Sequence, residues 1–349
     1  MRLKNSRQIP IFYVEGQNKS MDKKLVIIGS GPAGMVCAIN ALKSGVAKED
    51  ILIIEREEEL GGTLNLCIHT GFGKGNRTGT ELATDLANQI KNYGIEYLVG
   101  TTVISFNKDK EITIVSPNIG YEKVKAEAIV LATGCRERSR GGLSIGGTRP
   151  SGVISAGTAQ RFINIEGYLP GKKTIIVGTT NLALVIARRL SLEGGKVLCV
   201  CDARSKPQVD KKEIEECLEF FNIPLKLRTV VTKLFGKERL EAVELADLDK
   251  QGKIIRSTKR ILKCDSLVYS CGFIPENEIA SLAGVEIRKA THGPVVSKKL
   301  ETSIEGVFSC GNSRFIHKDV ISVMTDGKRV GKSVAEYLKK HKSQGGDGE

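Results

Sequence analysis

The sequence predicts an α/β protein of two similar three-layer domains, the second inserted in the first. A strand, a glycine-rich turn and a helix begin near residue 23, and the same order begins again near residue 173. A strand and turn over 307–312 and a helix over 319–339 resemble the closing elements of the first half. A length of 349 residues suits two domains that each bury a core.

The first half opens with one parallel βαβ unit. Lys23–Ile28 and Ile51–Glu55 are apolar and rich in β-branched residues, which is typical of buried parallel strands. Met35–Leu42 is the expected helix between them. Three elements should follow: a helix over 80–93, an antiparallel meander of short strands over 94–125 and an apolar strand over 126–132.

The second half repeats this order. Its expected elements are strands over 174–177 and 196–201 with a helix over 182–192 between them, a helix over 211–221 and short strands to about residue 269. We therefore expect a first domain over 21–155 and 285–340 and a second domain over 156–284. The basic segment 1–20 and the polar segment 341–349 are expected to be a disordered arm and tail.

Composition narrows the classes of function. The net charge of +13 comes from scattered residues without a nucleic-acid-binding signature, so we expect no nucleic-acid partner. No apolar run approaches the length of a membrane span, and residues 1–20 lack the apolar core of a secretory signal. Nine cysteines without a C-x-x-C pair indicate reduced, buried thiols and a cytoplasmic protein.

The strongest motif is the turn over 29–34, which reads Gly-Ser-Gly-Pro-Ala-Gly between a strand and a helix. Gly29 allows the tight turn, Gly31 lets a diphosphate approach the backbone, and Gly34 lets the helix pack against the sheet. The N-terminus of the helix then faces the phosphates. Glu55, at the end of the next strand, can accept hydrogen bonds from ribose hydroxyls. The motif and its context predict a Rossmann-like dinucleotide-binding domain.

Together with this turn, Glu55, Gly61-Gly62, the Ala132-Thr133-Gly134 run and the 306–312 run resemble the FAD-binding framework of the pyridine nucleotide-disulfide oxidoreductase superfamily. The runs over 61–73, 134–138, 157–161 and 164–168 resemble NAD/FAD oxidoreductase subunits associated with anaerobic glycerol-3-phosphate dehydrogenase-type flavoproteins. The resemblance implies two Rossmann-like domains and FAD as cofactor. It also implies that Asn312, where many relatives carry Asp, contacts the ribityl chain or the pyrophosphate. The FAD-binding set that we expect is Gly29, Gly31, Pro32, Ala33, Gly34, Glu55, Arg56, Gly62, Thr63, Val103, Ala132, Thr133, Gly134, Gly311 and Asn312.

The two redox cysteines of the disulfide reductases are missing. Aligned on Gly61-Gly62, their positions hold Leu64 and His69, so disulfide exchange is not expected. Cys67 and His69 remain near the expected isoalloxazine, where they either transfer protons and tune the flavin or simply pack and hydrogen-bond locally. No four-ligand spacing occurs, so no metal site is expected.

The second glycine-rich turn departs from the pattern. It keeps Gly178 but carries Thr180 where a diphosphate needs a bare Cα. Asp202 ends the next strand and favours NAD over NADP, although Arg204 lies close to it. NAD(H) binding is therefore expected, but in a weakened, altered or lost form.

Two functions follow. The first is an FAD-dependent oxidoreductase, or one component of such an enzyme, that passes electrons between NAD(H) and a partner flavoprotein or small acceptor. The second is an FAD-binding relay or structural subunit with a degenerate nicotinamide site. A second flavoprotein subunit, with glycerol 3-phosphate as one substrate, is the partner that the resemblance implies. An oligomer is a further expectation.

Overall fold

The computed structural model describes residues 21–73, 75–139, 141 and 145–344 of the chain. The expected arm over 1–20 lies outside the described residues, as does the tail from residue 345. The terminal helix α7 (Val320–Gln344) runs past the predicted end at 339, so residues 341–344 are helical rather than part of a tail. His341 helps to hold this end, since its ring lies 3.1 Å from Tyr337 O and 3.2 Å from Glu305 Oε1.

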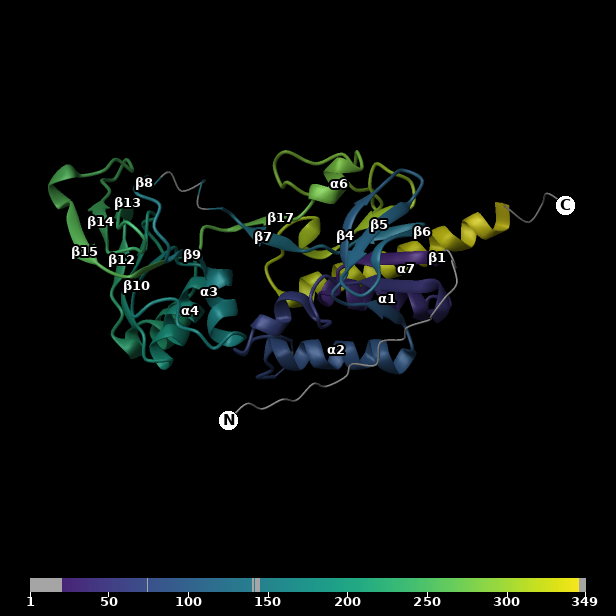
Figure 1. Cartoon of the computed structure of the whole chain (residues 1–349), viewed down its shortest axis with the longest axis horizontal. Coiled ribbons are helices and arrows are strands. Elements are labelled where there is room, and N and C mark those ends of the chain that lie inside the picture. Colours follow the sequence, from purple (N-terminus) through teal and green to yellow (C-terminus); the bar gives the residue numbers. More distant parts are fainter. Residues whose placement is uncertain (1–20, 74, 140, 142–144, 345–349) are drawn as a thin grey trace.

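The first unit is built on a mainly parallel sheet (Figure 1). Its parallel strands are β1 (Met21–Ile28), β2 (Ile51–Ile54), β3 (Glu96–Leu98), the second half of β6 (Gly120–Leu131) and β18 (Val307–Ser309). The antiparallel strands are β4 (Thr102–Phe106) and β5 (Glu111–Ser116). The order of strands in the whole sheet is β3-β2-β1-β6-β5-β4, and β18 pairs with β6. The meander and the strand predicted over 126–132 share β6, because no turn residue interrupts that run.

Each face of the parallel part of this sheet is covered by a different layer. Helices α1 (Pro32–Lys43), α2 (Gly79–Tyr93) and α7 share one core with alternate strand residues such as Ile27 and Val130. The strand residues between them, such as Ile28 and Leu131, face a second core that contains residues of β4, β5 and α6 (Glu278–Leu282). The result is the predicted three-layer domain with its meander.

The second unit repeats this design. Its parallel strands are β9 (Val153–Ser155), β10 (Lys173–Val177), β11 (Lys196–Asp202), β12 (Leu225–Leu227) and β16 (Ser266–Tyr269), in the order β12-β11-β10-β16-β9. Helices α3 (Ala156–Asn164), α4 (Asn181–Leu192) and α5 (Lys211–Cys217) cover one face. The other face packs on the antiparallel strands β13 (Thr229–Phe235), β14 (Ala242–Asp247) and β15 (Arg260–Lys263). The helix predicted over 211–221 ends at 217 and continues as a 3₁₀ turn, which stops at Asn222 in the left-handed region.

The two units are joined by a two-stranded ribbon of β7 (Cys135–Glu137) and β17 (Phe273–Pro275), seen between them in Figure 1. The strands β8 (Gly146–Gly147) and β9 pair with β13 and β16. The second unit therefore begins at β8 rather than after residue 155. Because α6 and Val285 belong to the core of the first unit, the chain returns at β17 rather than at 285.

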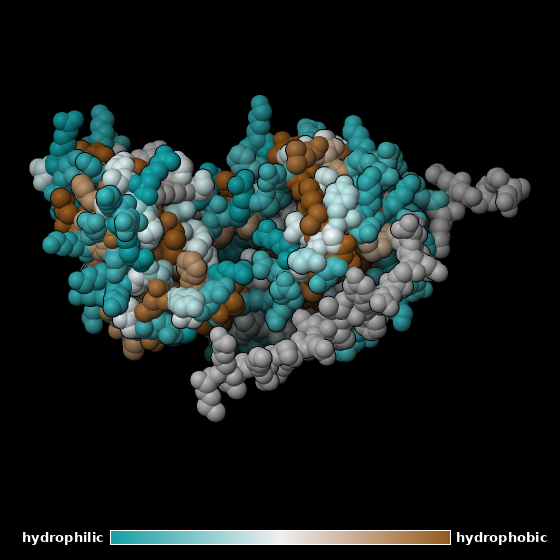
Figure 2. Space-filling model, in the orientation of Figure 1, coloured by the Kyte–Doolittle hydropathy of each residue, from teal (hydrophilic) through white to brown (hydrophobic). Residues whose placement is uncertain are grey.

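The hydropathy of the surface agrees with the content of charged residues in the sequence. Figure 2 shows a face that is mainly hydrophilic, with hydrophobic residues gathered in small patches. Within the described residues, no helix is both long and apolar enough to span a bilayer.

Candidate functional site

The turn over 29–34 lies at the carboxyl end of β1, where open α/β sheets bind their ligands. Gly29 has a φ of +104°, and a Cβ on it would lie 2.4 Å from Ala132 O. A Cβ on Gly34 would lie 2.0 Å from Gly29 O. A Cβ on Gly31 would meet nothing within 4 Å, and its φ of −61° suits any residue. Two of the glycines thus serve the fold, and Gly31 alone leaves room for a ligand.

Helix α1 begins without a side-chain cap. Gly31 is its N-cap, Pro32 fills its first position, and no acidic residue lies in its first turn. The first N–H groups of a helix have no partner within it, and they carry partial positive charge. This end of α1 can therefore hold an anion such as a diphosphate.

Glu55 is buried beside this turn and braces it. Its Oε2 accepts from Ser30 N at 2.8 Å and from Ser30 Oγ at 2.6 Å, and its Oε1 accepts from Glu57 N at 2.9 Å. Oε2 thus has two donors, whereas Oε1 has one donor and a second lone pair at which a ribose hydroxyl can still bind. Sequence reasoning missed Ser30, although a serine after the first glycine of the motif could have suggested it.

Several predicted residues gather around the turn. A Cβ on Gly62 would lie 3.0 Å from Gly31 Cα, and one on Gly311 would lie 2.7 Å from Ala33 Cβ. Gly134 has a φ of +72° and open space where a Cβ would lie. The turn, Gly62 and Gly311 therefore enclose one place at the carboxyl edge of the sheet.

The remaining predicted residues contribute less directly. Thr133 donates from Oγ1 to Glu276 O at 2.6 Å, which ties the run over 132–134 to the end of the ribbon. Arg56 is exposed and lies 3.8 Å from the carboxylate of Glu57, and Thr63 is exposed as well. Val103 of β4 is partly buried and packs against the core of the meander face, and its predicted cofactor contact stays a prediction.

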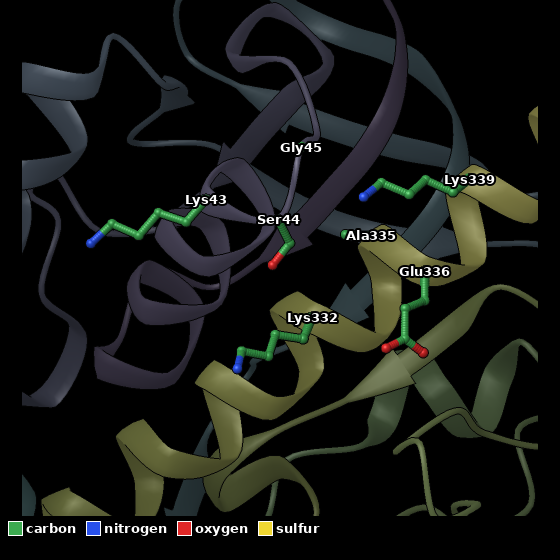
Figure 3. A pocket seen from close by; sticks show the side chains of 7 residues that line it. All are labelled: Lys43, Ser44, Gly45, Lys332, Ala335, Glu336 and Lys339. Atoms are coloured by element: carbon green, nitrogen blue, oxygen red, sulfur yellow. The ribbon is translucent and has the colours of Figure 1, made fainter.

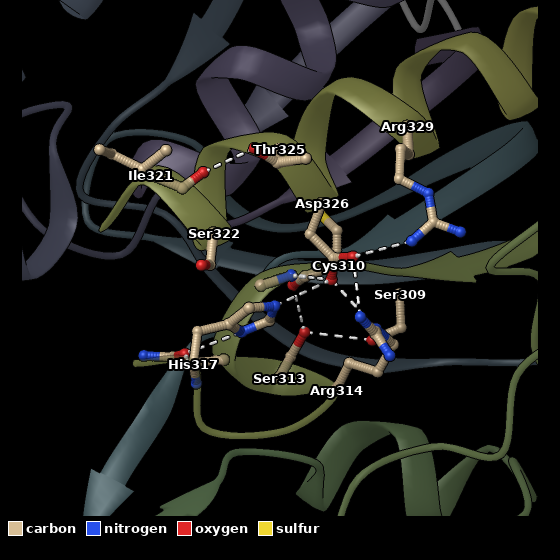
Figure 4. Close-up of polar contacts among 12 residues, drawn as sticks. Ser309, Cys310, Ser313, Arg314, His317, Ile321, Ser322, Thr325, Asp326 and Arg329 are labelled. Carbon is tan, nitrogen blue, oxygen red and sulfur yellow. Dashed lines mark hydrogen bonds and ion pairs between the residues drawn. The ribbon is translucent and has the colours of Figure 1, made fainter. Parts of the chain in front are cut away.

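Asn312 contacts His317, which belongs to a buried polar cluster that sequence reasoning missed. Figure 4 shows this cluster, with Asp326, Arg314 and His317 labelled. At its centre is Asp326 of α7, which is 4% exposed. Its carboxylate accepts two hydrogen bonds from Arg314, at 3.0 and 2.8 Å, and one from Gly311 N at 3.1 Å. His317 Nε2 lies 3.5 Å from Asp326 Oδ2. A signal was present in the sequence: an acidic residue inside an apolar helix stripe needs a partner.

The cluster fixes the charge of its carboxylate. Burial raises the pKa of Asp326, but hydrogen bonds from His317 and Arg314 and the charge of Arg314 outweigh burial and lower that pKa to about 2. Asp326 is therefore ionised at neutral pH and paired with a cation.

Cys67 and His69 have surroundings that favour their neutral forms. The Cys67 thiol donates to Thr63 O at 3.3 Å and lies 3.8 Å from Gln160 Nε2, and burial raises its pKa to about 11. The His69 ring packs edge-on against Phe72, and its Nδ1 is buried without a hydrogen-bond partner among the described residues. Burial, and then the charge of Arg188, lower the pKa of His69. A neutral thiol and a neutral imidazole do not make a nucleophilic pair.

The second turn copies the first in its buried part. A Cβ on Gly178 would lie 2.2 Å from Ser270 O. In the first turn, a Cβ on Gly29 would lie similarly close to Ala132 O. Asp202 Oδ2 accepts from Thr179 N at 3.0 Å and from Thr179 Oγ1 at 2.6 Å, as Glu55 accepts from Ser30.

The two turns differ at the helix N-cap. Thr180 is the N-cap of α4, where Gly31 is the N-cap of α1, and its Oγ1 accepts from Ala183 N at 3.2 Å. The same oxygen lies 2.6 Å from Ser270 Oγ. In the second unit a side chain of the protein itself therefore takes up part of the phosphate-binding end of the helix.

A hollow of about 560 Å³ lies elsewhere, at the carboxyl ends of α1 and α7 (Figure 3). Lys43, Ser44, Lys332 and Lys339 line it. It is separated from the turn by the length of α1, about 18 Å for twelve residues. It is not the predicted cofactor site.

Two units that each place a glycine turn at the carboxyl edge of a parallel sheet define a two-domain dinucleotide-binding protein. The sequence model of the family described as "Pyridine nucleotide-disulphide oxidoreductase" matches residues 23–331. The chain belongs to this family, whose members are FAD-dependent NAD(P)H oxidoreductases.

Its relatives have varied roles. The chain is 24% identical over 315 residues to one of the subunits of opine oxidase from Agrobacterium tumefaciens, a match that covers 82% of this chain and 60% of that protein. It is 22% identical over 323 residues to thioredoxin reductase of Listeria innocua, covering 91% and 94% of the two chains. The chain thus spans about 60% of the length of its opine oxidase relative.

Solved structures share the fold. Thioredoxin reductase of T. acidophilum has a TM-score of 0.72 at 21% identity, covering 91% of this chain and 99% of that one. Lactococcus lactis thioredoxin reductase in its FR conformation has a TM-score of 0.73 at 19% identity, with the same coverage.

Proposed function

We propose that this protein is an FAD-dependent oxidoreductase, or one component of such an enzyme, that passes electrons between NAD(H) and a partner flavoprotein or small acceptor. The observation that carries the proposal is the uncapped N-terminus of α1 beside Gly31, whose Cβ direction is open. These residues fit the diphosphate of FAD, and Glu55 is placed for its ribose. When bound, the flavin supplies the redox chemistry, and the chain binds and orients it.

The chemistry differs from disulfide exchange. Leu64 and His69 stand where the redox cysteines of disulfide reductases lie. The Cys67 thiol has a raised pKa, which disfavours the reactive thiolate. Acceptors other than a disulfide are therefore favoured, among them a partner of the glycerol-3-phosphate dehydrogenase type. Opine oxidase and hydrogen cyanide synthase relatives, which are named as subunits, support a multi-subunit assembly.

The direct test is to reconstitute the full chain with FAD and add NADH without oxygen. Loss of flavin absorbance supports the proposal. A chain that takes up no FAD contradicts it at the first step.

The proposed cytoplasmic location is supported by nine cysteines that are all free thiols, three of which are only partly buried.

A second candidate is a relay or structural component that binds FAD but no nicotinamide. The observation that favours it is the cap formed by Thr180, which uses one of the N–H groups that a diphosphate needs. In this case the flavin stays oxidised when NADH is added, and it is reduced only by the partner.

A further inference from the structure

Asn312 lies where the bound cofactor is expected. Gly311, beside it, packs against Ala33 of the turn, and Cys310 N donates to Leu131 O at 3.1 Å. This places Asn312 at the carboxyl edge of the sheet, between the turn and the run that ends at Gly134. Its two neighbours in sequence are buried, whereas Asn312 itself is partly exposed.

The orientation of the Asn312 amide group is fixed by the main chain. The backbone N–H of His317 points at Asn312 Oδ1 from 2.9 Å. A backbone N–H can only donate, so the atom that faces it must be the oxygen. The ring Nδ1 of His317 lies 3.2 Å from the same oxygen and therefore carries a hydrogen. Both contacts hold the NH₂ group of Asn312 on the opposite side.

His317 is itself held in place (Figure 4). Its side chain is 5% exposed and stacks on Phe315, with ring centroids 4.1 Å apart. Its Nε2 faces Asp326, whose carboxylate is fixed by two bonds from Arg314. The imidazole therefore has little freedom to turn away from Asn312.

Within the part of the chain that the structure describes, the NH₂ group of Asn312 has little to bind. Its contact among the described residues is Cys135 Sγ at 3.7 Å, and a thiol is a weak acceptor. An amide group has two hydrogens to donate, so one is left for a ligand.

We propose that His317 and Asp326 are positioning residues that lock Asn312 as a hydrogen-bond donor to an oxygen of the cofactor diphosphate. The inference rests on the proposed binding of FAD. An aspartate at this place could only accept and would repel a diphosphate, whereas the locked amide donates to it without adding charge.

The test measures FAD affinity of the full chain after removal of flavin, by fluorescence titration. Asn312→Ala should weaken binding roughly ten- to hundredfold, as expected for one hydrogen bond to a charged group. His317→Phe keeps the stacking partner of Phe315 but loses both ring contacts, and it should weaken binding by a similar or smaller factor. Because His317 acts through Asn312, the double variant should bind FAD no more weakly than Asn312→Ala alone. Additive losses would overturn the inference.

The chain offers a matched control in His341. It lies on α7 like Asp326, with Nδ1 near a carbonyl oxygen and Nε2 near a carboxylate, but at the far end of the helix. His341→Phe should leave FAD affinity unchanged. The melting temperature of each flavin-free variant separates a loss of fold from a loss of binding.

Asn312→Asp keeps the shape of the side chain and distinguishes which group of FAD residue 312 contacts. A diphosphate partner predicts at least a tenfold loss of affinity, whereas a ribityl hydroxyl, which can donate, predicts affinity that is kept and would contradict the inference. If the wild-type chain binds no FAD, the proposed function fails. If it binds FAD and these variants do too, only the role of Asn312 and His317 fails.

Discussion

The hydroxyl oxygens of Thr180 and Ser270 lie 2.6 Å apart at the N-terminus of α4, beside the N–H of Ala183 that Thr180 caps. The equivalent place in the first unit holds Gly31 and is open. The same chain thus contains an open and a self-capped form of one nucleotide-binding turn.

Thr180→Gly should open the second turn. It removes the cap and the Cβ together, so a diphosphate gains both N–H groups and space, and NADH should bind at least tenfold more tightly by calorimetry. Ser155→Gly is the matched control, because Ser155 caps α3 in the same way, through Thr158 N. Each change should cost only a few tenths of a kcal/mol in stability. Equal NADH affinity in Thr180→Gly and wild type would show that the hydroxyl pair does not obstruct the site.

Gly31→Val should abolish FAD retention without unfolding the chain. The new Cβ has open space among the described residues and a permitted φ, so the steric conflict that we expect is with the ligand. The flavin-free variant should melt within a few degrees of flavin-free wild type. Gly29→Val is the contrast, because its Cβ would collide with Ala132 O, and it should lower the melting temperature itself. Normal flavin content in Gly31→Val would refute the assigned site.

Acid should weaken the fold through Asp326. Its pKa of about 2 in the folded state is below the value of about 3.9 for a free Asp. Its stabilising contribution is therefore complete above pH 4 and is lost as the pH falls towards 2, and it amounts to roughly 2–3 kcal/mol. Urea unfolding between pH 5 and pH 2 should show a shallower decline in Asp326→Asn than in wild type. At pH 7 that variant should be less stable by about 3 kcal/mol, because Arg314 loses its partner.

Cys67 should react slowly with alkylating reagents. A pKa of about 11 leaves roughly a hundredfold less thiolate at pH 8 than a free cysteine has. Labelling followed by mass spectrometry should give a rate that rises about tenfold per pH unit between pH 8 and pH 10, as the thiolate fraction does below the pKa. Cys67→Ser should retain FAD and its reduction by NADH. A Cys67 labelled at the rate of free cysteine, with activity lost in the serine variant, would instead support a thiolate role.

The order of elements could be predicted because the strands that face two cores are continuously apolar, as Leu25–Ile28 and Ile51–Ile54 show. The glycine turn was also predictable, since its spacing specifies both a backbone shape and a ligand. The boundaries between the units are hard to predict, because short strands such as β8 pair over long sequence separations that leave no local pattern.

The site was harder to predict. Arg314 and His317 lie in the connection between β18 and α7, so only the fold brings them to Asp326. The sequence spacing shows that Thr180 replaces a glycine of the motif. Its bond to Ser270, ninety residues later, could not be inferred from the sequence.

The close packing of α1 on α7 has a consequence for biosynthesis. A Cβ on Gly327 would lie 2.3 Å from Ala33 O, and one on Gly331 would lie 2.5 Å from Cys37 O, so the backbones of the two helices touch. Helix α1 leaves the ribosome early, and α7 leaves only after the entire second unit. The first unit cannot complete its core or its diphosphate cradle until then, so the second unit is free to fold before the first one does.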